Sequence, residues 1–281
     1  MSGSSKPSKR WQWRAEWVLQ TALENLLAWL PGGIVYRLGL LMGGLAWHVL
    51  PTRRAIVLRN LRIAFAGEKD AAEIRRIARE SFLRTGANLF SAAHSARLPA
   101  SRLQRILHVE NPALMAEAGG GVAGPVLLLA HMSNWELLAR MVHFFPPGTR
   151  AGAFYRPLNN PLLDQRALRR READGTRMFS KGDNPHQAVS FLRDRGCIGI
   201  LADQRTGLAG EVTEFFGRLT RCSPLPGLLA RRAKVPVAAL ALSTTAPGRW
   251  TARYLPVGER RATADCMAAL EQTMRVAPEE V

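Results

Sequence analysis

The second half of the chain alternates short apolar runs with amphipathic segments, and this alternation restricts the possible folds more than any other feature. Strands are predicted at residues 125–130, 151–155, 177–179, 197–202, 235–242 and 250–256. Helices are predicted at residues 135–145, 161–173, 185–195, 226–233 and 263–276. Strands and helices that alternate in this way form a parallel or mixed sheet with helices on both faces. The sequence therefore predicts an α/β domain over residues 122–281, with a mixed, mostly parallel sheet covered by helices.

Polar residues follow three of the predicted strands. His131, Arg156 and Asp203 each come directly after a strand. Open α/β sheets bind ligands at the carboxyl ends of their strands. We therefore expect a functional site at this edge of the sheet.

The segment His131-Met-Ser-Asn-Trp-Glu136 has two interpretations. A histidine at a strand end can act as a general base, oriented by a carboxylate one helical turn further on. Apart from Ser133, which the second interpretation assigns to a helix cap, no Ser or Cys lies nearby in the sequence, so the proton donor would be a substrate hydroxyl. Alternatively, Ser133 and Glu136 match an S-x-x-E capping box, which alone would explain Glu136. A lone histidine is also more often structural than catalytic, so the residues by themselves leave both interpretations open.

Other motifs argue against several enzyme classes. Residues 119–124 fit G-x-G-x-x-G, but they precede a strand, whereas a dinucleotide fingerprint follows one, so a loop is predicted. The sequence contains no G-x-x-x-x-G-K-[ST], G-x-S-x-G or H-E-x-x-H. These absences argue against nucleotide triphosphatases, serine hydrolases and zinc peptidases.

Composition indicates an anionic partner without identifying it. The 281 residues are 47% apolar, which excludes a disordered chain and a polytopic membrane protein. A net charge of +17 suits nucleic acid, anionic lipid, or a phosphorylated or acidic substrate. Three separated cysteines without a C-x-x-C indicate neither a disulfide framework nor a zinc site. We expect the working parts of the protein to face a reducing cytoplasm.

The first 50 residues differ from the rest of the chain. Residues 1–10 are polar and basic, and a disordered tail is predicted there. Five of the seven tryptophans follow within residues 11–50, where two helices are expected at 14–30 and 34–50. The polar residues of the first helix, at positions 16, 20 and 24, lie on one stripe.

A membrane anchor is the preferred interpretation of residues 11–50. The uncharged run at residues 38–50 is shorter than the ~20 residues that span a bilayer. The anchor would therefore dip into one leaflet or barely cross it, with tryptophans at the interface and flanking arginines on anionic headgroups. The alternative is a pair of core helices in a soluble domain. Residues 51–121 are predicted to be a helical region packed on the catalytic domain.

Several blocks of sequence, in order along the chain, carry a family resemblance. They are Arg59-Asn60-Leu61, Ala64-Phe65, His131 to Glu136 as H-x-x-N-W-E, Tyr155-Arg156-Pro157, Asn160-Pro161, Asp164, Leu201-Ala202-Asp203-Gln204, Phe215-Phe216-Gly217, Leu229-Ala230 and Val235-Pro236-Val237. Together they resemble the bacterial lipid A biosynthesis acyltransferases of the late, lauroyl- and myristoyl-transferring type. This family lies within the glycerolipid acyltransferase superfamily, which is marked by H-x-x-x-x-[DE].

The resemblance implies an O-acyltransferase with a glycerolipid acyltransferase-like fold. In this family the histidine is taken as the base that deprotonates the acceptor hydroxyl, and the acidic residue as its orienter. These roles fall on His131 and Glu136. Arg156 would contact an acceptor phosphate or the thioester oxyanion, although a buried salt bridge is an alternative. The residues that would complete the substrate-binding site are Asn134, Tyr155, Asp203 and Gln204.

The resemblance also implies partners and a location. The acyl donor would be acyl carrier protein or acyl-CoA, and the acceptor an anionic phosphoglycolipid such as a lipid A precursor. The chemistry needs a base, an oxyanion stabiliser and an apolar groove, with no metal or other cofactor. The protein would lie on the cytoplasmic face of the inner membrane through its N-terminal segment, without a nucleic-acid partner.

Two other functions remain open from the sequence. An acyltransferase of the same architecture could act on another lipid, such as a lysophospholipid or a glycolipid. A membrane-tethered nucleic-acid-binding protein would also suit the charge of +17. Against it, the sequence has no helix-turn-helix, RNP-like or zinc-finger signature, and its charge is scattered.

Overall fold

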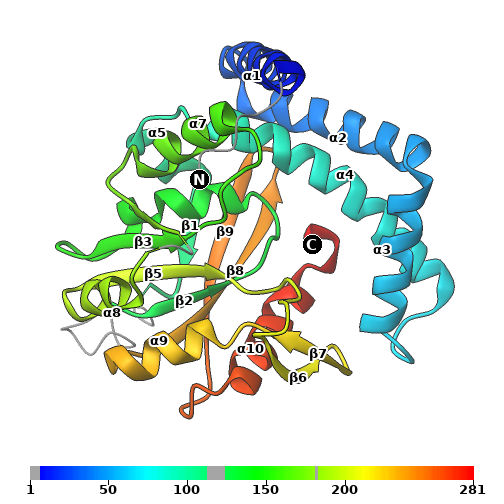
Figure 1. The fold of residues 1–281 in the computed structure, drawn as a ribbon. Coiled ribbons are helices and arrows are strands. Elements are labelled where there is room, and N and C mark those ends of the chain that lie inside the picture. The colour runs from blue at the N-terminus through cyan, green and yellow to red at the C-terminus, as the bar shows by residue number, and fades with distance from the viewer. Residues whose placement is uncertain (1–6, 113–123, 181–182) are drawn as a thin grey trace.

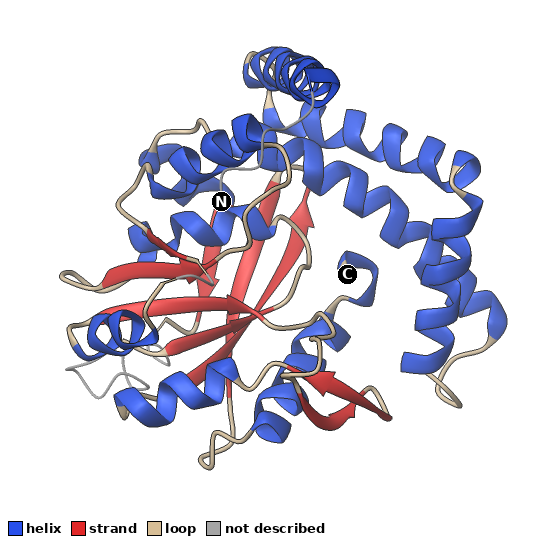
Figure 2. Cartoon of the chain, viewed as in Figure 1, coloured by secondary structure: helices blue, strands red, loops and turns tan. Residues whose placement is uncertain are grey.

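A computed structural model describes residues 7–112, 124–180 and 183–281, as a helical N-terminal part beside an α/β part (Figures 1 and 2). The helices are α1 (Pro7–Ala28), α2 (Gly32–Val49), α3 (Pro51–Ala64), α4 (Ala71–Ser95), α5 (Ala100–Ile106), η1 (Trp135–Phe144), α7 (Pro161–Glu172), α8 (Pro185–Arg193), α9 (Leu225–Ala233), α10 (Thr263–Val276) and η2 (Pro278–Glu280). The strands are β1 (Leu107–Glu110), β2 (Val126–Leu129), β3 (Arg150–Phe154), β4 (Arg177–Phe179), β5 (Gly196–Leu201), β6 (Glu211–Phe215), β7 (Arg218–Cys222), β8 (Val237–Ala246) and β9 (Arg249–Pro256).

Seven strands form one sheet in the order β1-β9-β8-β2-β5-β3-β4. All neighbouring pairs are parallel except β8 and β9, which are antiparallel. The predicted α/β class, with a mixed and mostly parallel sheet covered by helices, is confirmed. Strand β2 lies between β8 and β5. The carboxyl ends of β2 and β5 therefore lie side by side, and this positions the residues that follow them.

Strand β2 is buried on both faces. Val126 and Leu128 belong to an apolar cluster formed with α8, α9 and α10. Leu127 and Leu129 belong to a second cluster on the other face, formed with η1, α2, α4 and α5. Because helices cover both faces of the sheet, the strand is a continuous apolar run rather than an alternating one.

The predicted strands and helices of the α/β part agree with the structure to within a few residues, but three strands were missed. Strand β1 lies in the region predicted to be only helical, and β6 and β7 form a separate antiparallel hairpin. The turn of this hairpin is Phe216-Gly217, with φ of 50° and 68°. Two positive φ values are typical of a type I′ turn, whose twist suits a two-residue hairpin loop. The predicted loop at residues 119–124 lies almost entirely outside the described residues.

Helix α1 turns its polar stripe toward the protein. It begins at Pro7, within the segment predicted to be a disordered tail, of which residues 1–6 lie outside the described residues. The Glu24 side chain is 3% exposed and pairs with Arg166 and Arg170 of α7. In contrast, Leu19 is 71% exposed. The helix is therefore held to the α/β part by a buried carboxylate, and apart from the buried Leu27 its leucines face outward.

Helix α2 packs closely on α4 through glycines. A Cβ at Gly39 would lie 2.5 Å from the Cα of Ala87, and a Cβ at Gly43 would lie 2.2 Å from the Phe82 carbonyl oxygen. Only glycine permits this approach of two backbones. The opposite side of α2 is exposed and apolar, and its residues are Ile34, Leu38, Leu41, Met42, Leu45 and Val49.

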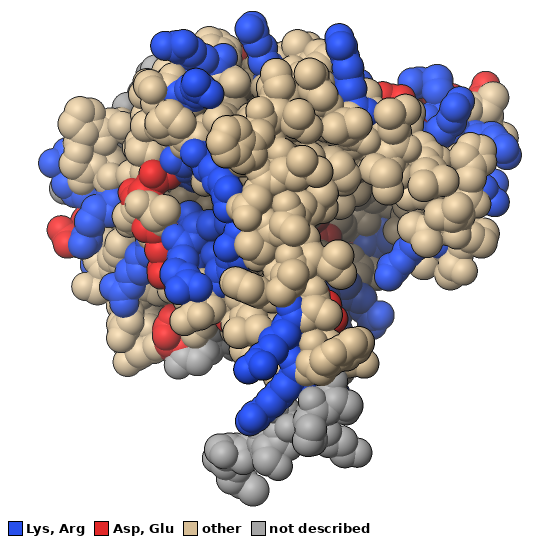
Figure 3. Space-filling model, turned by 90° about the horizontal axis from the view of Figure 1, so that it is seen from above, with Lys and Arg blue, Asp and Glu red and all other residues tan. Residues whose placement is uncertain are grey.

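The helical membrane anchor is not supported as a single span. Within the described residues, no individual helix is both long and apolar enough to cross a bilayer. Helices α2 and α3 together meet the requirement in length and composition, but they are bent by 95° at their junction. The outer face of the N-terminal helices carries uncharged side chains over its middle, with Lys and Arg around them (Figure 3).

Candidate active site

The carboxyl ends of β2 and β5 bring His131 and Asp203 together. One Asp203 oxygen lies 2.7 Å from Nδ1 of His131, and the other accepts the His131 backbone N–H at 3.0 Å. A carboxylate can only accept hydrogen bonds, so Nδ1 carries the proton and Nε2 keeps its lone pair. The His131 side chain is 31% exposed and that of Asp203 is 9% exposed. The pair is therefore an oriented imidazole whose free nitrogen can accept a proton.

Glu136, the predicted orienter, has a different partner. Its carboxylate forms a bidentate ion pair with Arg171 of α7, at 2.5 and 3.0 Å. Burial opposes the charge of Arg171, but the hydrogen bond and charge of Glu136 outweigh it and raise the pKa of the guanidinium. The contact expected between His131 and Glu136 is made by Asp203 instead, which the resemblance had placed among the substrate-binding residues.

The capping box is not formed. The Ser133 backbone N–H donates to the Glu280 carbonyl oxygen at 2.7 Å, so it is not available to Glu136. Ser133 has φ of 54°, in the left-handed region, and the helix that follows is a 3₁₀ helix rather than an α-helix. The C-terminal segment thus fixes the loop that follows His131.

Asn134, predicted to bind substrate, is buried in the structure. It is 1% exposed, and its Nδ2 donates to the Ser95 hydroxyl of α4 at 3.3 Å. It ties the loop after His131 to the helical part. The structure thus gives its amide a contact within the protein, whereas the resemblance implied a substrate-binding role.

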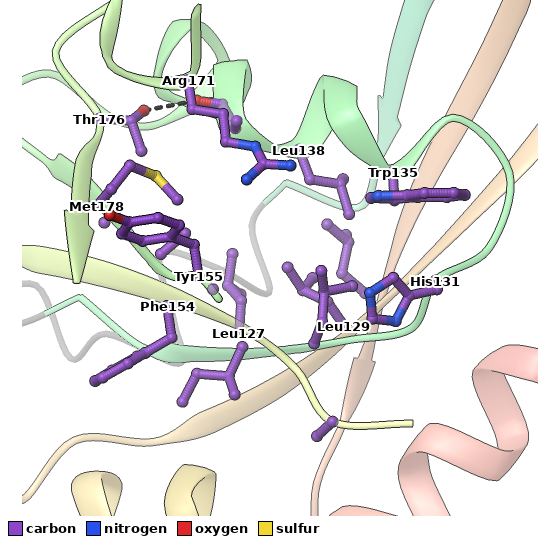
Figure 4. Close-up of a pocket in the computed structure, with 18 of the residues that line it drawn as sticks. Leu127, Leu129, His131, Trp135, Leu138, Phe154, Tyr155, Arg171, Thr176 and Met178 are labelled. Atoms are coloured by element: carbon purple, nitrogen blue, oxygen red, sulfur yellow. Dashed lines mark hydrogen bonds between the residues drawn. The ribbon is translucent and has the colours of Figure 1, made fainter. Parts of the chain in front are cut away.

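An apolar cavity of about 620 Å³ opens beside His131 (Figure 4). It lies on the η1 side of the sheet, where Leu127 and Leu129 of β2 form part of its wall. Further apolar lining comes from Leu138, Met141, Phe145, Phe154, Met178, Leu201 and Leu240. Cys197 also lines the cavity, and burial raises the pKa of its thiol, which keeps it neutral. A cavity of this size and lining suits a long hydrocarbon chain.

Polar residues line the same cavity together with His131. Tyr155 and Arg156 follow β3, and Gln204 follows β5. Arg156 is exposed, and no hydrogen bond or ion pair from the described part of the chain engages it, so the alternative of a buried salt bridge is not supported. Partial burial and the nearby carboxylate of Asp164 raise the pKa of Tyr155. These side chains form a polar border to an apolar cavity.

Sequence reasoning missed two lining residues. Arg171 lies in a run of three arginines on α7 that reads as a solvated face, and only its contact with Glu136 separates it from its neighbours. Trp135 packs edge-to-face against the His131 ring, with centroids 5.6 Å apart. The signal for Trp135 was its position inside the motif. The sequence contains no signal that distinguishes Arg171 from the neighbouring arginines.

Within the described residues, no group of three or more His, Cys, Asp and Glu side chains could hold a metal ion. The available chemistry is that of an imidazole base, a supporting carboxylate and several cationic side chains. The fold and site therefore define an α/β protein in which a histidine held by a carboxylate opens on an apolar cavity.

Comparison with known proteins identifies the family. Residues 5–281 match the model of the bacterial lipid A biosynthesis acyltransferases, so the chain belongs to this family. It is 31% identical to a lipid A biosynthesis lauroyltransferase of Escherichia coli over 139 residues. This match covers 50% of this chain and 44% of that protein. It is 26% identical to the lipid A biosynthesis palmitoleoyltransferase of the same organism over 197 residues. This match covers 69% of this chain and 63% of that protein. The resemblance based on the motifs is thus confirmed.

Proposed function

We propose that this protein transfers a fatty acyl chain from an acyl thioester to a hydroxyl group of a lipid A precursor or related phosphoglycolipid. The observation that carries the proposal is the His131–Asp203 pair beside an apolar cavity of about 620 Å³. The names of the two relatives support the same acyl-transfer chemistry and the same pathway. The apolar cavity holds the acyl chain. Within the described residues, the His131 imidazole is the only base of the cavity lining that a carboxylate orients.

The reaction follows from the two nitrogens of His131. Nε2 accepts the proton of the acceptor hydroxyl while the oxygen attacks the thioester carbonyl carbon. The carbon–sulfur bond then breaks, and the imidazolium returns the proton to the leaving thiolate. Asp203 holds the ring through Nδ1 and stabilises the imidazolium between these two steps. Asp203 therefore takes the orienting role that the motif had suggested for Glu136.

The cationic side chains of the cavity suit the anionic groups of both substrates. Arg156 is exposed and unpaired within the described residues, so it can contact an acceptor phosphate or the oxyanion of the tetrahedral intermediate. The ion pair of Glu136 with Arg171 makes a fixed polar wall beside the chain. Tyr155 and Gln204 add hydrogen-bonding groups in the same lining.

The acyl donor is acyl carrier protein or acyl-CoA. The net charge of +17 favours either, since both are anionic. Membrane association is proposed through the outer faces of α1 and α2, on the cytoplasmic side of the inner membrane. Trp11 on α1 and Trp29 directly after it are 72% and 88% exposed, and side chains of this kind favour the membrane interface.

Mass spectrometry of the acceptor tests this function. Purified protein is incubated with a lipid A precursor and either an acyl carrier protein thioester or acyl-CoA. We expect the acceptor to gain the mass of one acyl chain with wild type and not with His131→Ala. A lysophospholipid serves as a parallel acceptor. Acylation of the lysophospholipid, with the lipid A precursor unchanged, would contradict the proposed acceptor.

A further inference from the structure

A second apolar cavity lies next to the His131–Asp203 pair. It has a volume of about 520 Å³, and Asp203 is part of its lining. Its walls come from α3 and the residue after it, the β6–β7 hairpin, α10 and the C-terminal segment. Three aromatic rings contribute to these walls, those of Phe65, Phe215 and Phe216.

The two cavities meet at the catalytic pair from different sides. His131 lines the first cavity and does not line the second, whereas Asp203 lines the second and not the first. The pair therefore stands between them. In an acyl transfer between two lipids, the attacking hydroxyl and the thioester carbonyl meet at Nε2, but the two hydrocarbon chains must leave in different directions. A second cavity beside the same pair provides the second direction.

The charge around the second cavity suits a phosphorylated lipid. Helix α3, which forms one wall, contains four arginines and no acidic residue. Within the described part of the chain, no hydrogen bond or ion pair engages Arg53, Arg59 or Arg62. Arg275 lies over the rings of both Phe65 and Phe216, at 5.2 and 5.3 Å from their centroids. None of these arginines is among the described residues that line the cavity, and Arg275 is paired with Glu68 and Glu271. The exposed arginines of α3 lie on a helix that forms the cavity wall, and this arrangement matches a hydrocarbon chain in the cavity joined to an anionic headgroup outside it.

We infer that this second cavity, lined by Leu61, Ala64, Phe65, Phe215, Phe216 and Met274, binds a hydrocarbon chain of the phosphorylated lipid acceptor. The inference rests on the proposed function and adds a binding site for the acceptor. The unpaired arginines of α3 bind the acceptor phosphate, and the first cavity remains the site of the donor chain.

Photo-crosslinking in wild-type protein tests the assignment directly. Two probes are used, a lipid A precursor and an acyl thioester, each with a diazirine at the end of a fatty chain. We expect the acceptor probe to label residues 57–65 or 215–220, and the donor probe to label β2 or β3. Labelling of β2 or β3 by the acceptor probe, or of α3 by the donor probe, would overturn the inference.

A cavity-filling variant with a matched control provides the kinetic test. Ala64→Trp fills the second cavity, whereas Ala55→Trp places the same side chain on an exposed position of the same helix. We expect Ala64→Trp to raise the KM for the lipid A precursor about tenfold or more, while the KM for the thioester stays unchanged. Ala55→Trp should leave both constants near their wild-type values. An unchanged acceptor KM in a folded Ala64→Trp protein would refute the site.

The two proposals fail in different ways. If wild type acylates the lipid A precursor but the acceptor probe does not label the second cavity, only the chain-binding site is wrong. If wild type does not acylate the precursor at all, the proposed function fails and the acceptor site fails with it.

Discussion

Helix α1 and strand β2 are both rich in leucine, but they turn these side chains in opposite directions. In β2, Leu127 and Leu128 are 3% and 0% exposed. In α1, Leu19 and Leu26 are 71% and 63% exposed, while Glu24 of the same helix is 2% exposed. Apolar burial positions the strand, whereas a buried carboxylate between two arginines positions the helix.

The comparison shows that an apolar stripe does not always mark the face that packs on the protein. A buried carboxylate without partners is costly, so the arginines of α7 determine which side of α1 faces inward. Asn160 adds to this contact by donating to the Trp13 carbonyl oxygen at 3.0 Å and to Glu16 at 2.8 Å. Three of the α1 leucines, Leu19, Leu23 and Leu26, are exposed and thus left free for another apolar phase, which we propose to be the membrane.

The largest effect on activity is expected at the end of β2, where a functional residue follows a buried strand. His131→Ala should lower turnover about 10²–10⁴-fold, because it removes the general base. The strand itself remains buried, so the melting temperature should stay close to that of wild type. Turnover per folded molecule is the measurement. A variant with near-normal turnover would contradict the role of His131.

Truncations in the two regions should differ strongly in stability. Leu128→Ala removes a fully buried side chain from β2 and should lower the free energy of unfolding by about 2–5 kcal/mol. Leu26→Ala on α1 is the matched control, since the same change at an exposed position should cost within about 0.5 kcal/mol. Denaturant titration of both variants measures the difference. Equal losses would show that α1 is also packed through its leucines.

The contact that orients α1 should depend on pH. Burial raises the pKa of the Glu24 carboxyl, but hydrogen bonds from Arg170, Gln20 and Arg166 outweigh it, so the pKa lies below its ordinary 4.5. A lowered pKa stabilises the folded protein above pH 4.5, and this contribution is lost as the pH falls through the folded-state pKa. Glu24→Gln should cost about 1–3 kcal/mol at neutral pH. The cost should shrink in acid, and a pH-independent cost in thermal unfolding would argue against a charged Glu24.

The smallest effect on stability is expected on the outer face of α1. Leu23→Ser changes a side chain that is 43% exposed, so the free energy of unfolding should change by about 0.5 kcal/mol or less. Binding to vesicles that contain anionic lipid should nevertheless weaken, because an apolar contact with the membrane is lost. Sedimentation with vesicles measures this, at low and high salt. Undiminished binding that salt releases would indicate electrostatic adhesion alone.

The α/β part was predictable because its signals are local. Buried strands read as apolar runs, and proline or a polar cap marks the start of several helices, as Asn160-Pro161 does for α7. Strand β1 has only four residues and an uneven burial pattern, so it carries little such signal. The contact between His131 and Asp203 spans 72 positions and depends on β2 pairing with β5. Strand order cannot be derived from one sequence, whereas Glu136 lies five positions from His131 and completes the family motif, so the sequence favoured Glu136 over Asp203.

The most direct test of the central claim compares two substitutions, Asp203→Asn and Glu136→Gln, in one acyl-transfer assay. Asparagine keeps the size of Asp203 but removes the charge that stabilises the imidazolium of His131, so turnover should fall by about tenfold or more at an unchanged melting temperature. Glutamine at 136 can still bond to Arg171, so turnover should fall less. The opposite ranking, with Glu136→Gln the more damaging at equal stability, would contradict the assignment of Asp203 as the orienting carboxylate.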